Sequence, residues 1–503
     1  MNPPRLFSWR LLSWLALYFV LWTVLPLWLS GSYPLDVVEG IYWGHEWQWG
    51  YYKHPPLSSW LLYGFYAVFG HIGPYLLSQL AIVLSLWLVY RLGRQLMSRQ
   101  RALLGSLLLL AVFYYTWPSL EFNHNIAQLP VWAGIIYAFY LAITTQRLRY
   151  WLLFGLLAGA GMLVKYTVAI LLLVAVLYSL LTPQRRLWRT RGPWLALLLA
   201  LLVFLPNVLW LWQHEWLPFT YAQARAAEAE SSGGRLSALG FLATQLLNHL
   251  PLLLILLATR TGLQRLPENT DTAALARPNP QAQRFLWVMG LGPALLLVLL
   301  GLLLGIGLRD MWGMPMWSLS GLLVASLIPA ARFERQYPRL LKGLAVWLLL
   351  ATVLMGSYVQ WGGQWRNKPS RMDWPQAALA QQANSTWQAL SQCGLDNIAG
   401  DYWLAGLAAT YPSESGQPSV MIAGNPAYSP WMSTARLQSH GSLMVWPQGA
   451  PPPVPLLDNL PPNSGLVVRE GEWQIAWQKL PKRAPLAVQW RAYIPQSCFK
   501  PQP

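Results

Sequence analysis

The chain has 503 residues, of which 55% are hydrophobic and only 11% are charged, whereas an average soluble domain has roughly 25% charged residues. Its formal net charge is +17 at pH 7. This composition excludes an ordinary soluble protein and predicts a polytopic α-helical membrane protein. Orientation on anionic membrane lipids explains the basic excess better than nucleic-acid binding, which would need a basic soluble face or motif.

Long apolar runs predict the membrane spans, since a helix that crosses a hydrocarbon core of about 30 Å needs roughly 17 to 25 residues. We expect about eleven spans, with an uncertainty of about two. They are residues 11–30, 72–90, 102–117, 126–144, 151–163, 166–181, 193–212, 239–257, 285–307, 313–330 and 344–360. The first run is long, rich in Leu and Trp and lacks a clear cleavage site, so we expect a retained anchor rather than a signal peptide.

Lys and Arg alternate between loops, and short loops rich in these residues stay in the cytoplasm. The basic loops are centred on residues 5–10, 91–101, 147–149, 185–191, 260–284 and 332–342. The alternation places the N-terminus in the cytoplasm and predicts that residues 151–181 cross twice, with Lys165 at the outer turn. It also predicts that residues 57–70 form a helix in the outer interface.

The opening outer loop is unusually polar and aromatic. Residues 33–60 read YPLDVVEGIYWGHEWQWGYYKHPPLSSW and contain Asp36, Glu39 and Glu46 together with several His, Tyr and Trp side chains. Most carboxylates before residue 361 fall on the outer side, although acidic residues contribute little to orientation. We therefore expect an outer-face site in this loop, with its aromatic rings acting as interfacial anchors.

A second outer segment, residues 213–237, contains the flexible sequence Ser231-Ser232-Gly233-Gly234. It could close over the site as a lid or be an ordinary mobile connection.

After residue 360 the composition becomes rich in Pro, Gln and Ser. Short apolar strings bounded by turn formers, such as SVMIAG, SLMVWP, WQIAWQ and LAVQW, predict buried strands, and GLDNIAGDYWLAGLAATYP predicts a strand leading into a helix. We expect residues 361–503 to form a periplasmic α/β domain after a transmembrane domain of residues 1–360 with its outer loop at 31–71. Both cysteines, Cys393 and Cys498, lie in this tail and suit one disulfide, two buried thiols being the alternative.

Several motifs, in order along the chain, resemble the bacterial branch of glycosyltransferase family 39, which includes dolichyl-phosphate-mannose protein mannosyltransferases and the lipid A aminoarabinose transferase. They are the loop with Asp36 and Glu39, WGYYKHPPL, FNHNIAQLPVW, LVKYTVAILL, RDMWGMPMW and GDYWLAGL. This chain has Lys53-His54 where the aminoarabinose transferases typically have Glu-Lys. It has Asn125 where many relatives have Asp.

The resemblance implies a GT-C-type, inverting enzyme of the bacterial inner membrane, active at the periplasmic face. It would move a sugar from a polyprenyl-phosphate donor to a lipid A, glycan or protein acceptor. Family logic makes Asp36 the base and Glu39 its partner. The outer-side substrate-binding candidates are Lys53, His54, Asn125, Lys165 and Arg309.

Two alternatives remain at this stage. A noncatalytic partner in envelope assembly would keep the same topology, and a transporter or flippase would place ionisable groups inside its spans. A divalent metal is possible but has only weak candidate ligands in His45 and His54, because a histidine in an aromatic loop is more often a packing residue.

Overall fold

The structure is a computed structural model that describes residues 9–230, 235, 237–261, 280–411, 416–453 and 465–501. Two compact units are present. The helical unit comprises Met1–Val24, Lys53–Ser58 and Tyr75–Leu354, and the sheet unit comprises Leu25–Tyr52, Ser59–Pro74 and Met355–Pro503. The sheet unit therefore combines most of the opening outer loop with the residues from Met355 onward.

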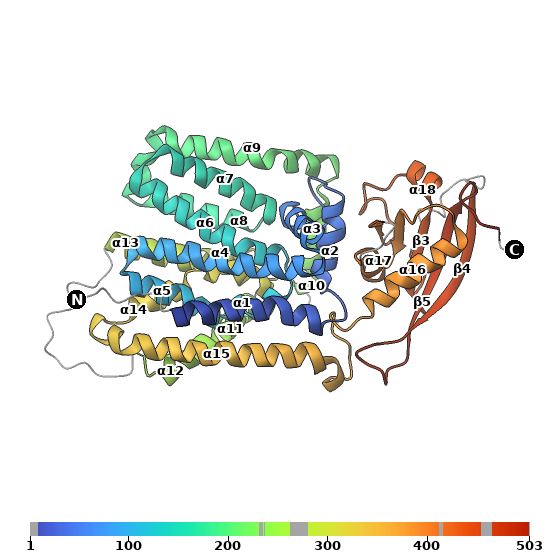
Figure 1. Ribbon diagram of the computed structural model, residues 1–503. Helices are drawn as coiled ribbons and strands as arrows, with labels where there is room; N and C mark the ends of the chain where they lie inside the picture. The colour runs from blue at the N-terminus through green and yellow to red at the C-terminus, as the bar shows by residue number, and fades with distance from the viewer. Residues whose placement is uncertain are drawn as a thin grey trace. The chain divides into compact units, whose positions relative to one another are not determined.

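The helical unit consists of apolar α-helices joined by short 3-10 turns (Figure 1). Its main helices are α1 (Trp9–Leu29), α4 (Gly73–Leu96), α5 (Arg99–Leu108), α6 (His124–Thr145), α7 (Leu148–Val164), α8 (Val168–Leu181), α9 (Arg191–Gln213), α10 (Leu217–Glu230), α11 (Ser237–Asn248), α12 (Leu250–Ala258), α13 (Pro280–Leu304), α14 (Ser320–Leu327) and α15 (Ala330–Trp365). Its 3-10 segments include η2 (Leu109–Ala111), η3 (Phe113–Tyr115), η4 (Trp117–Leu120), η5 (Pro183–Arg189) and η8 (Asp310–Trp317). The ends of α1, α4 and α15 extend into the sheet unit.

Among the described residues, six helices are long and apolar enough to cross a membrane, or up to nine if each bent pair is one span. The expected spans at 102–117, 166–181 and 239–257 correspond to those bent pairs. The span expected at 151–163 is the shorter helix α7, and the one at 313–330 is divided between η8 and α14. The protein is thus a multi-pass membrane protein, as the composition predicts.

The apolar stretch at 57–70 is a separate helix, α3 (Leu57–Phe69), followed by η1 (Gly70–Ile72) and then α4. Gly70 has a φ of 61°, a left-handed conformation that ends the helix and that glycine adopts without strain. A Cβ on Gly73 would lie 2.3 Å from the carbonyl oxygen of Phe65, so the chain turns back closely at this point. The candidate membrane span in this region is Leu57–Leu96, which takes in α3, η1 and α4.

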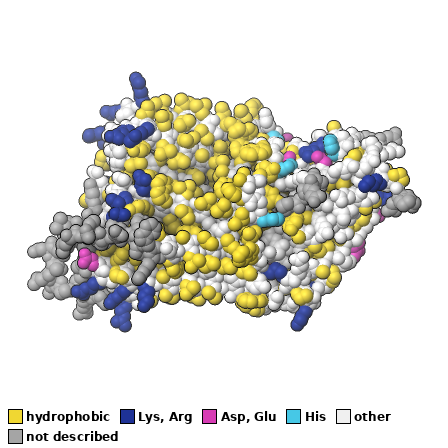
Figure 2. Space-filling model, in the orientation of Figure 1, with side chains coloured by type: hydrophobic (Ala, Val, Ile, Leu, Met, Phe, Trp, Pro, Cys, Tyr) yellow, Lys and Arg dark blue, Asp and Glu magenta, His cyan; other side chains and the backbone are white. Residues whose placement is uncertain are grey.

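Basic side chains are segregated in the helical unit. Figure 2 shows Lys and Arg gathered at one end of this unit, whereas hydrophobic side chains cover the length of its helices. The basic loops expected from the sequence fall at the turns between α4 and α5, between α6 and α7, and between α8 and α9. The structure thus reproduces the separation of charge on which the expected topology depends.

Small residues let α7 and α9 pack closely. A Cβ on Gly155 would lie 2.3 Å from the carbonyl oxygen of Ala196, and one on Gly159 would lie 2.7 Å from that of Ala200. Glycines spaced by four residues have the same role in other membrane helix pairs, where close backbone approach replaces a hydrophobic driving force. A buried hydrogen bond of 2.8 Å from Trp22 Nε1 to Thr352 Oγ1 similarly joins α1 to α15.

The sheet unit contains a five-stranded mixed sheet in the order β2-β1-β3-β5-β4. The strands are β1 (Asn397–Gly400), β2 (Ser419–Ile422), β3 (Ser442–Pro447), β4 (Leu466–Ile475) and β5 (Leu486–Pro495). Strand β1 is parallel to β2 and β3, whereas β5 is antiparallel to β3 and β4. The parallel strands are buried throughout, which explains why they read as continuous apolar strings in the sequence.

Three helices and the opening loop complete the sheet unit. The helices are α16 (Gln376–Leu390), α17 (Tyr402–Ala409) and α18 (Thr434–His440), and the opening loop supplies α2 (Leu35–His45) and α3. The backbone N–H of Tyr33 donates to Gln376 Oε1 at 3.0 Å, and Tyr66 Oη donates to the carbonyl oxygen of Thr410 at 3.0 Å. These contacts explain why the opening loop forms one compact unit with the C-terminal residues.

Two cross-links tie distant segments of the sheet unit together. Cys393 and Cys498 form a disulfide. Lys479 Nζ lies 3.0 Å from Asp373 Oδ1 and donates hydrogen bonds to the carbonyl oxygens of Leu29, at 2.7 Å, and of Val359. Since Leu29 ends α1 and Val359 lies in α15, this one ammonium group links two membrane helices to the C-terminal residues.

We expect Lys479→Met to destabilise the protein by about 3 to 5 kcal/mol, because it leaves the carboxylate of Asp373 buried without its countercharge. The Asp373 side chain is only 3% exposed. Arg491→Met is the matched control, since its partner Glu470 is largely exposed and such pairs contribute about 0 to 1 kcal/mol. Thermal unfolding in detergent checks both variants, and equal melting temperatures for the two would contradict the assignment.

Candidate functional site

The N-terminus of α6 lies in the helical unit and begins with a polar cap. The side-chain oxygen of Asn123 accepts hydrogen bonds from the backbone N–H groups of Asn125 and Ile126, at 2.9 and 3.1 Å. This cap satisfies two backbone donors that the first turn of a helix otherwise leaves unpaired. It also holds the side chains of His124 and Asn125 at the end of a long apolar helix.

Lys165 terminates the neighbouring helix α7, where it is the C-cap residue. Its residue surface is only 7% exposed, and its Nζ donates a hydrogen bond to Asn125 Oδ1. A cation at the C-terminal end of a helix is favoured by the helix dipole. Asn125 is neutral, so this hydrogen bond orients the ammonium group and contributes no compensating negative charge.

Two histidines pack against each other beside this lysine. The ring centroids of His54 and His124 are 3.7 Å apart. Burial lowers the pKa of His54 well below its usual value, and the positive charges of Lys165 and Lys53 lower it further. His54 is therefore neutral at physiological pH and can exchange hydrogen bonds without adding charge.

Lys53, the residue before His54, contacts the segment 213–237, which was expected to be either a lid or a mobile connection. Its Nζ lies 5.6 Å from the ring centroid of Tyr221, within the range of a cation–π interaction. Tyr221 belongs to α10, so the expected lid is helical over Leu217–Glu230. The Ser231–Gly234 segment lies outside the described residues.

The residues Lys53, His54, His124, Asn125 and Lys165 together form what we call the cation cluster. It combines two ammonium groups, two imidazoles, an amide and the N-terminus of α6 in one part of the helical unit. Cations and helix N-termini are the groups that proteins use to bind phosphate oxygens. The arrangement is thus chemically suited to an anionic phosphate.

The expected acidic residues lie on α2 in the sheet unit. Asp36 is in the first turn and partly exposed, whereas Glu39 is only 3% exposed. Their spacing of three residues places them on the same side of the helix. Burial raises the pKa of Tyr42, and the negative charges of Glu39 and of Asp401 raise it further, so Glu39 and Asp401 both lie close to that phenol.

The expectation that the aromatic rings of the opening loop are interfacial anchors is wrong for half of them. Four are buried in the sheet unit, namely Tyr33, Tyr42, Trp43 and Tyr51. Trp43 stacks on Tyr51 with ring centroids 5.4 Å apart, and Tyr52 stacks on Tyr428 at 4.7 Å. Only Trp47 and Trp49 of the expected set are exposed. The four buried rings therefore stabilise the loop instead of anchoring it.

Arg309 and His45 are the two remaining candidates from the sequence, and each has described neighbours of its own. Arg309 precedes η8, whose first residue, Asp310, accepts hydrogen bonds at its carbonyl oxygen from Tyr114 Oη and Gln245 Nε2. His45 Nδ1 lies 3.1 Å from Glu46 Oε1 in the sheet unit. Within the described part of the chain, no three His, Cys, Asp or Glu side chains lie together as a possible metal site.

Two members of the arrangement were not recognised from the sequence. They are His124 and Tyr221, neither of which is among the substrate-binding candidates expected from the sequence. A usable local signal for His124 is its place in a His-Asn pair directly after Asn123, the N-cap residue of α6. Tyr221 contacts Lys53 across a long sequence separation, and no local pattern could have indicated it.

Comparison with known proteins gives consistent similarities. The family model described as dolichyl-phosphate-mannose-protein mannosyltransferase matches residues 53–210. The lipopolysaccharide core galacturonosyltransferase RgtB of Rhizobium johnstonii is 27% identical over 478 residues, which cover 89% of this chain and 90% of RgtB. RgtA of the same organism is 29% identical over 205 residues, 39% of this chain and only 40% of RgtA.

A third relative is the undecaprenyl phosphate-α-4-amino-4-deoxy-L-arabinose arabinosyl transferase of Pseudomonas aeruginosa. It is 35% identical over 169 residues, 31% of this chain and 30% of the relative. Among solved structures, ArnT from Cupriavidus metallidurans bound to undecaprenyl phosphate superposes with a TM-score of 0.62 and 14% identity, covering 98% of this chain and 99% of that one. The last likeness shows that the two proteins share a fold.

Proposed function

We propose that this chain, a glycosyltransferase of the family-39 type in the inner membrane, moves a sugar from a polyprenyl-phosphate donor to an acceptor in the cell envelope. The observation that carries the proposal is the cation cluster, in which Lys53 and Lys165 lie near two histidines whose rings pack against each other, beside the N-terminus of α6. The names of the relatives support a lipid-phosphate donor. RgtB, which matches along most of the chain, supports a lipopolysaccharide acceptor over a protein.

In the proposed reaction, an acceptor hydroxyl attacks the anomeric carbon of the sugar. The new C–O bond forms as the bond from that carbon to the phosphate oxygen breaks, so the configuration inverts and polyprenyl phosphate leaves with the bonding electrons. The negative charge that develops on the leaving phosphate is stabilised by Lys53 and Lys165. His54 and Asn125 orient the phosphate and the Lys165 ammonium group.

The acceptor hydroxyl must lose its proton, and we propose that Asp36 accepts it. Asp36 is partly exposed in the first turn of α2, where the helix dipole favours the carboxylate form. The buried Glu39 is a less suitable base, and we assign it a positioning role. Tyr221 on α10, which covers Lys53, would help to exclude water.

Asp36→Asn keeps the size of the side chain but removes the proton acceptor, and we expect transfer to fall by about 10² to 10⁴-fold. Folding should be retained, because Asp36 is partly exposed. The assay is transfer from an undecaprenyl-phosphate-linked sugar extract to lipopolysaccharide in liposomes, read by mass spectrometry. Glu46→Gln is the control, since glutamine still accepts a hydrogen bond from His45. A folded Asp36→Asn protein with the wild-type rate would overturn the role of Asp36.

We also propose that the opening loop and the C-terminal residues face the periplasm, because the basic loops at the opposite ends of the spans favour the cytoplasm. Trp49→Cys, at a position that is 43% exposed, should react in intact cells with a thiol reagent that cannot cross the inner membrane. Thr190→Cys, next to η5, should react only after the membrane is opened. The two native cysteines form a disulfide and would not interfere. The reverse labelling pattern would contradict this orientation.

A further inference from the structure

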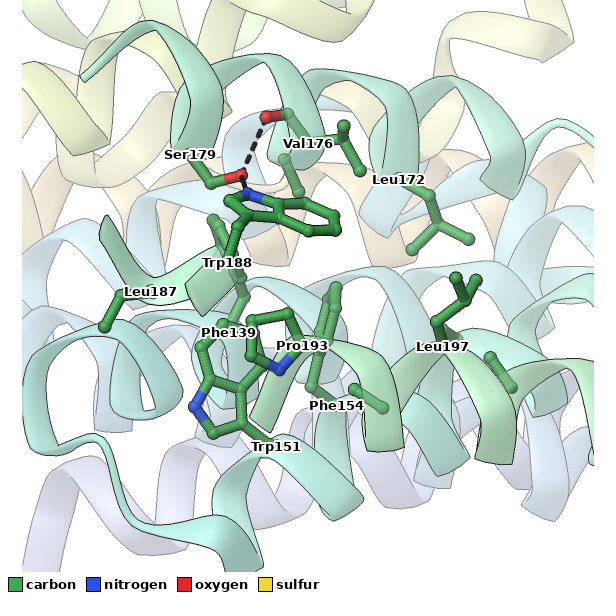
Figure 3. Close-up of a pocket in the computed structure, with 14 residues that line it drawn as sticks. Phe139, Trp151, Phe154, Leu172, Val176, Ser179, Leu187, Trp188, Pro193 and Leu197 are labelled. Atoms are coloured by element: carbon green, nitrogen blue, oxygen red, sulfur yellow. Dashed lines mark hydrogen bonds between the residues drawn. The ribbon is translucent and has the colours of Figure 1, made fainter. Parts of the chain in front are cut away.

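A hydrophobic cavity of about 120 Å³ lies among α6, α7, α8, η5 and α9 of the helical unit (Figure 3). Its walls include Phe139 of α6, Phe154 of α7, Leu172 of α8 and Leu197 of α9, and Trp188 of η5 lines the same space. Leu197 is exposed on the outer surface of α9, so hydrocarbon from the bilayer can reach this region. The cavity is distinct from the cation cluster and is not used in the proposed reaction.

Two polar side chains of the wall, those of Trp188 and Ser179, make hydrogen bonds within the protein. Trp188 Nε1 donates to Ser179 Oγ at 2.9 Å, and Ser179 Oγ donates to the carbonyl oxygen of Val176 at 2.7 Å (Figure 3). Trp194 Nε1 donates to the carbonyl oxygen of Trp188 at 2.9 Å, which fixes η5 to the start of α9. The cavity therefore presents an apolar lining that suits hydrocarbon.

The volume of the cavity limits the size of the molecule that it can hold. Small-molecule pockets usually measure roughly 300 to 1,000 Å³, whereas an apolar cavity of about 150 Å³ can hold a molecule the size of benzene. The lining of α8 runs from Leu172 to Ser179, which corresponds to about 10 Å along the helix. One segment of a single acyl chain fits these dimensions, with the remainder of the chain in the bilayer.

The segment η5 places positive charge beside the cavity and so favours a negatively charged lipid. It is bent by 100° from α8, so it runs across the direction of that helix as an interfacial helix would. Leu187 and Trp188 of η5 line the cavity, while Arg185, Arg186 and Arg189 of the same segment are exposed. Basic groups beside a pocket between membrane helices are typical of sites for anionic lipid headgroups.

We propose that this cavity and η5 form a binding site for one anionic phospholipid. An acyl chain enters between Leu172 and Leu197, Trp188 packs on the chain near its headgroup end, and the phosphate lies against Arg185, Arg186 and Arg189. The three arginines lie close together in η5, so their combined positive charge favours an anionic lipid over a zwitterionic one. The small side chains of Ala175 and Ala200 leave room for the chain.

The test uses purified full-length protein titrated in detergent with phosphatidylglycerol or phosphatidylcholine of identical acyl chains, with bound lipids counted by native mass spectrometry. Replacing Arg185, Arg186 and Arg189 by Gln should weaken phosphatidylglycerol binding by about tenfold or more and leave phosphatidylcholine unchanged. The control variant replaces the exposed Arg335, Arg339 and Lys342 of α15 by Gln and so removes the same charge. It should weaken phosphatidylglycerol binding much less.

A second variant tests the cavity. Ala200→Leu fills it and should weaken phosphatidylglycerol binding with the arginines intact. Three results would overturn the proposal: equal losses from the two triple replacements, no preference of the wild type for phosphatidylglycerol, or an Ala200→Leu variant that loses undecaprenyl phosphate but not phosphatidylglycerol. The last result would assign the cavity to the tail of a polyprenyl lipid. The arginine variants alter exposed side chains, so they test the site even if Ala200→Leu fails to fold.

Discussion

A buried ammonium group at the junction of two membrane helices constrains the helical unit. Lys165 is removed from water at the end of α7, and such a charge is costly unless polar groups surround it. The amide of Asn125 and the C-terminal end of α7 supply those groups, and Asn123 in turn caps the helix that presents Asn125. The α6 and α7 ends must therefore stay together, which places a strong cation at one end of an apolar bundle.

The same physical problem has a different solution in the sheet unit. Lys479 is partly buried, and its ammonium group contacts the carboxylate of Asp373 and two backbone carbonyl oxygens. It therefore has a structural role. Lys165 donates a hydrogen bond to Asn125 at the N-terminus of α6, beside His54 and His124. Phosphate binding is proposed for Lys165 because a helix N-terminus and a second lysine, Lys53, belong to the same cluster, whereas the contacts of Lys479 link helices.

Much of the architecture could be predicted from the sequence because hydrophobic periodicity and charge report directly on burial. The strings SVMIAG, SLMVWP and LAVQW predicted three strands that form in the sheet, since each is bounded by turn formers. Helix α16 was missed, because in QAALAQQANSTWQAL the apolar residues are mostly small Ala side chains among Gln, Asn, Ser and Thr, and only one narrow face is buried. The span expected at 102–117 is broken by the 3-10 turns that follow Ala111.

The candidate site could be predicted only in part from the sequence. Lys53, His54 and Lys165 were candidates because the predicted topology puts them on the outer side, and Asn125 was one because many relatives have Asp there. Their mutual contacts depend on which helix ends meet, and a single sequence does not report this. The role of the aromatic loop was misjudged for a related reason: Trp and Tyr are common both at membrane interfaces and in cores, and only contacts such as Trp43 with Tyr51 distinguish the two.

The central claim is that the cation cluster binds the phosphate of the lipid carrier, and direct binding of undecaprenyl phosphate tests it without any knowledge of sugar or acceptor. We expect Lys165→Met to weaken binding by about tenfold or more, because hydrogen bonds to charged groups contribute roughly 1.5 to 3 kcal/mol. Lys342→Met, at an exposed position on α15, should bind as the wild type does. A folded Lys165→Met protein with undiminished affinity for undecaprenyl phosphate would contradict the account.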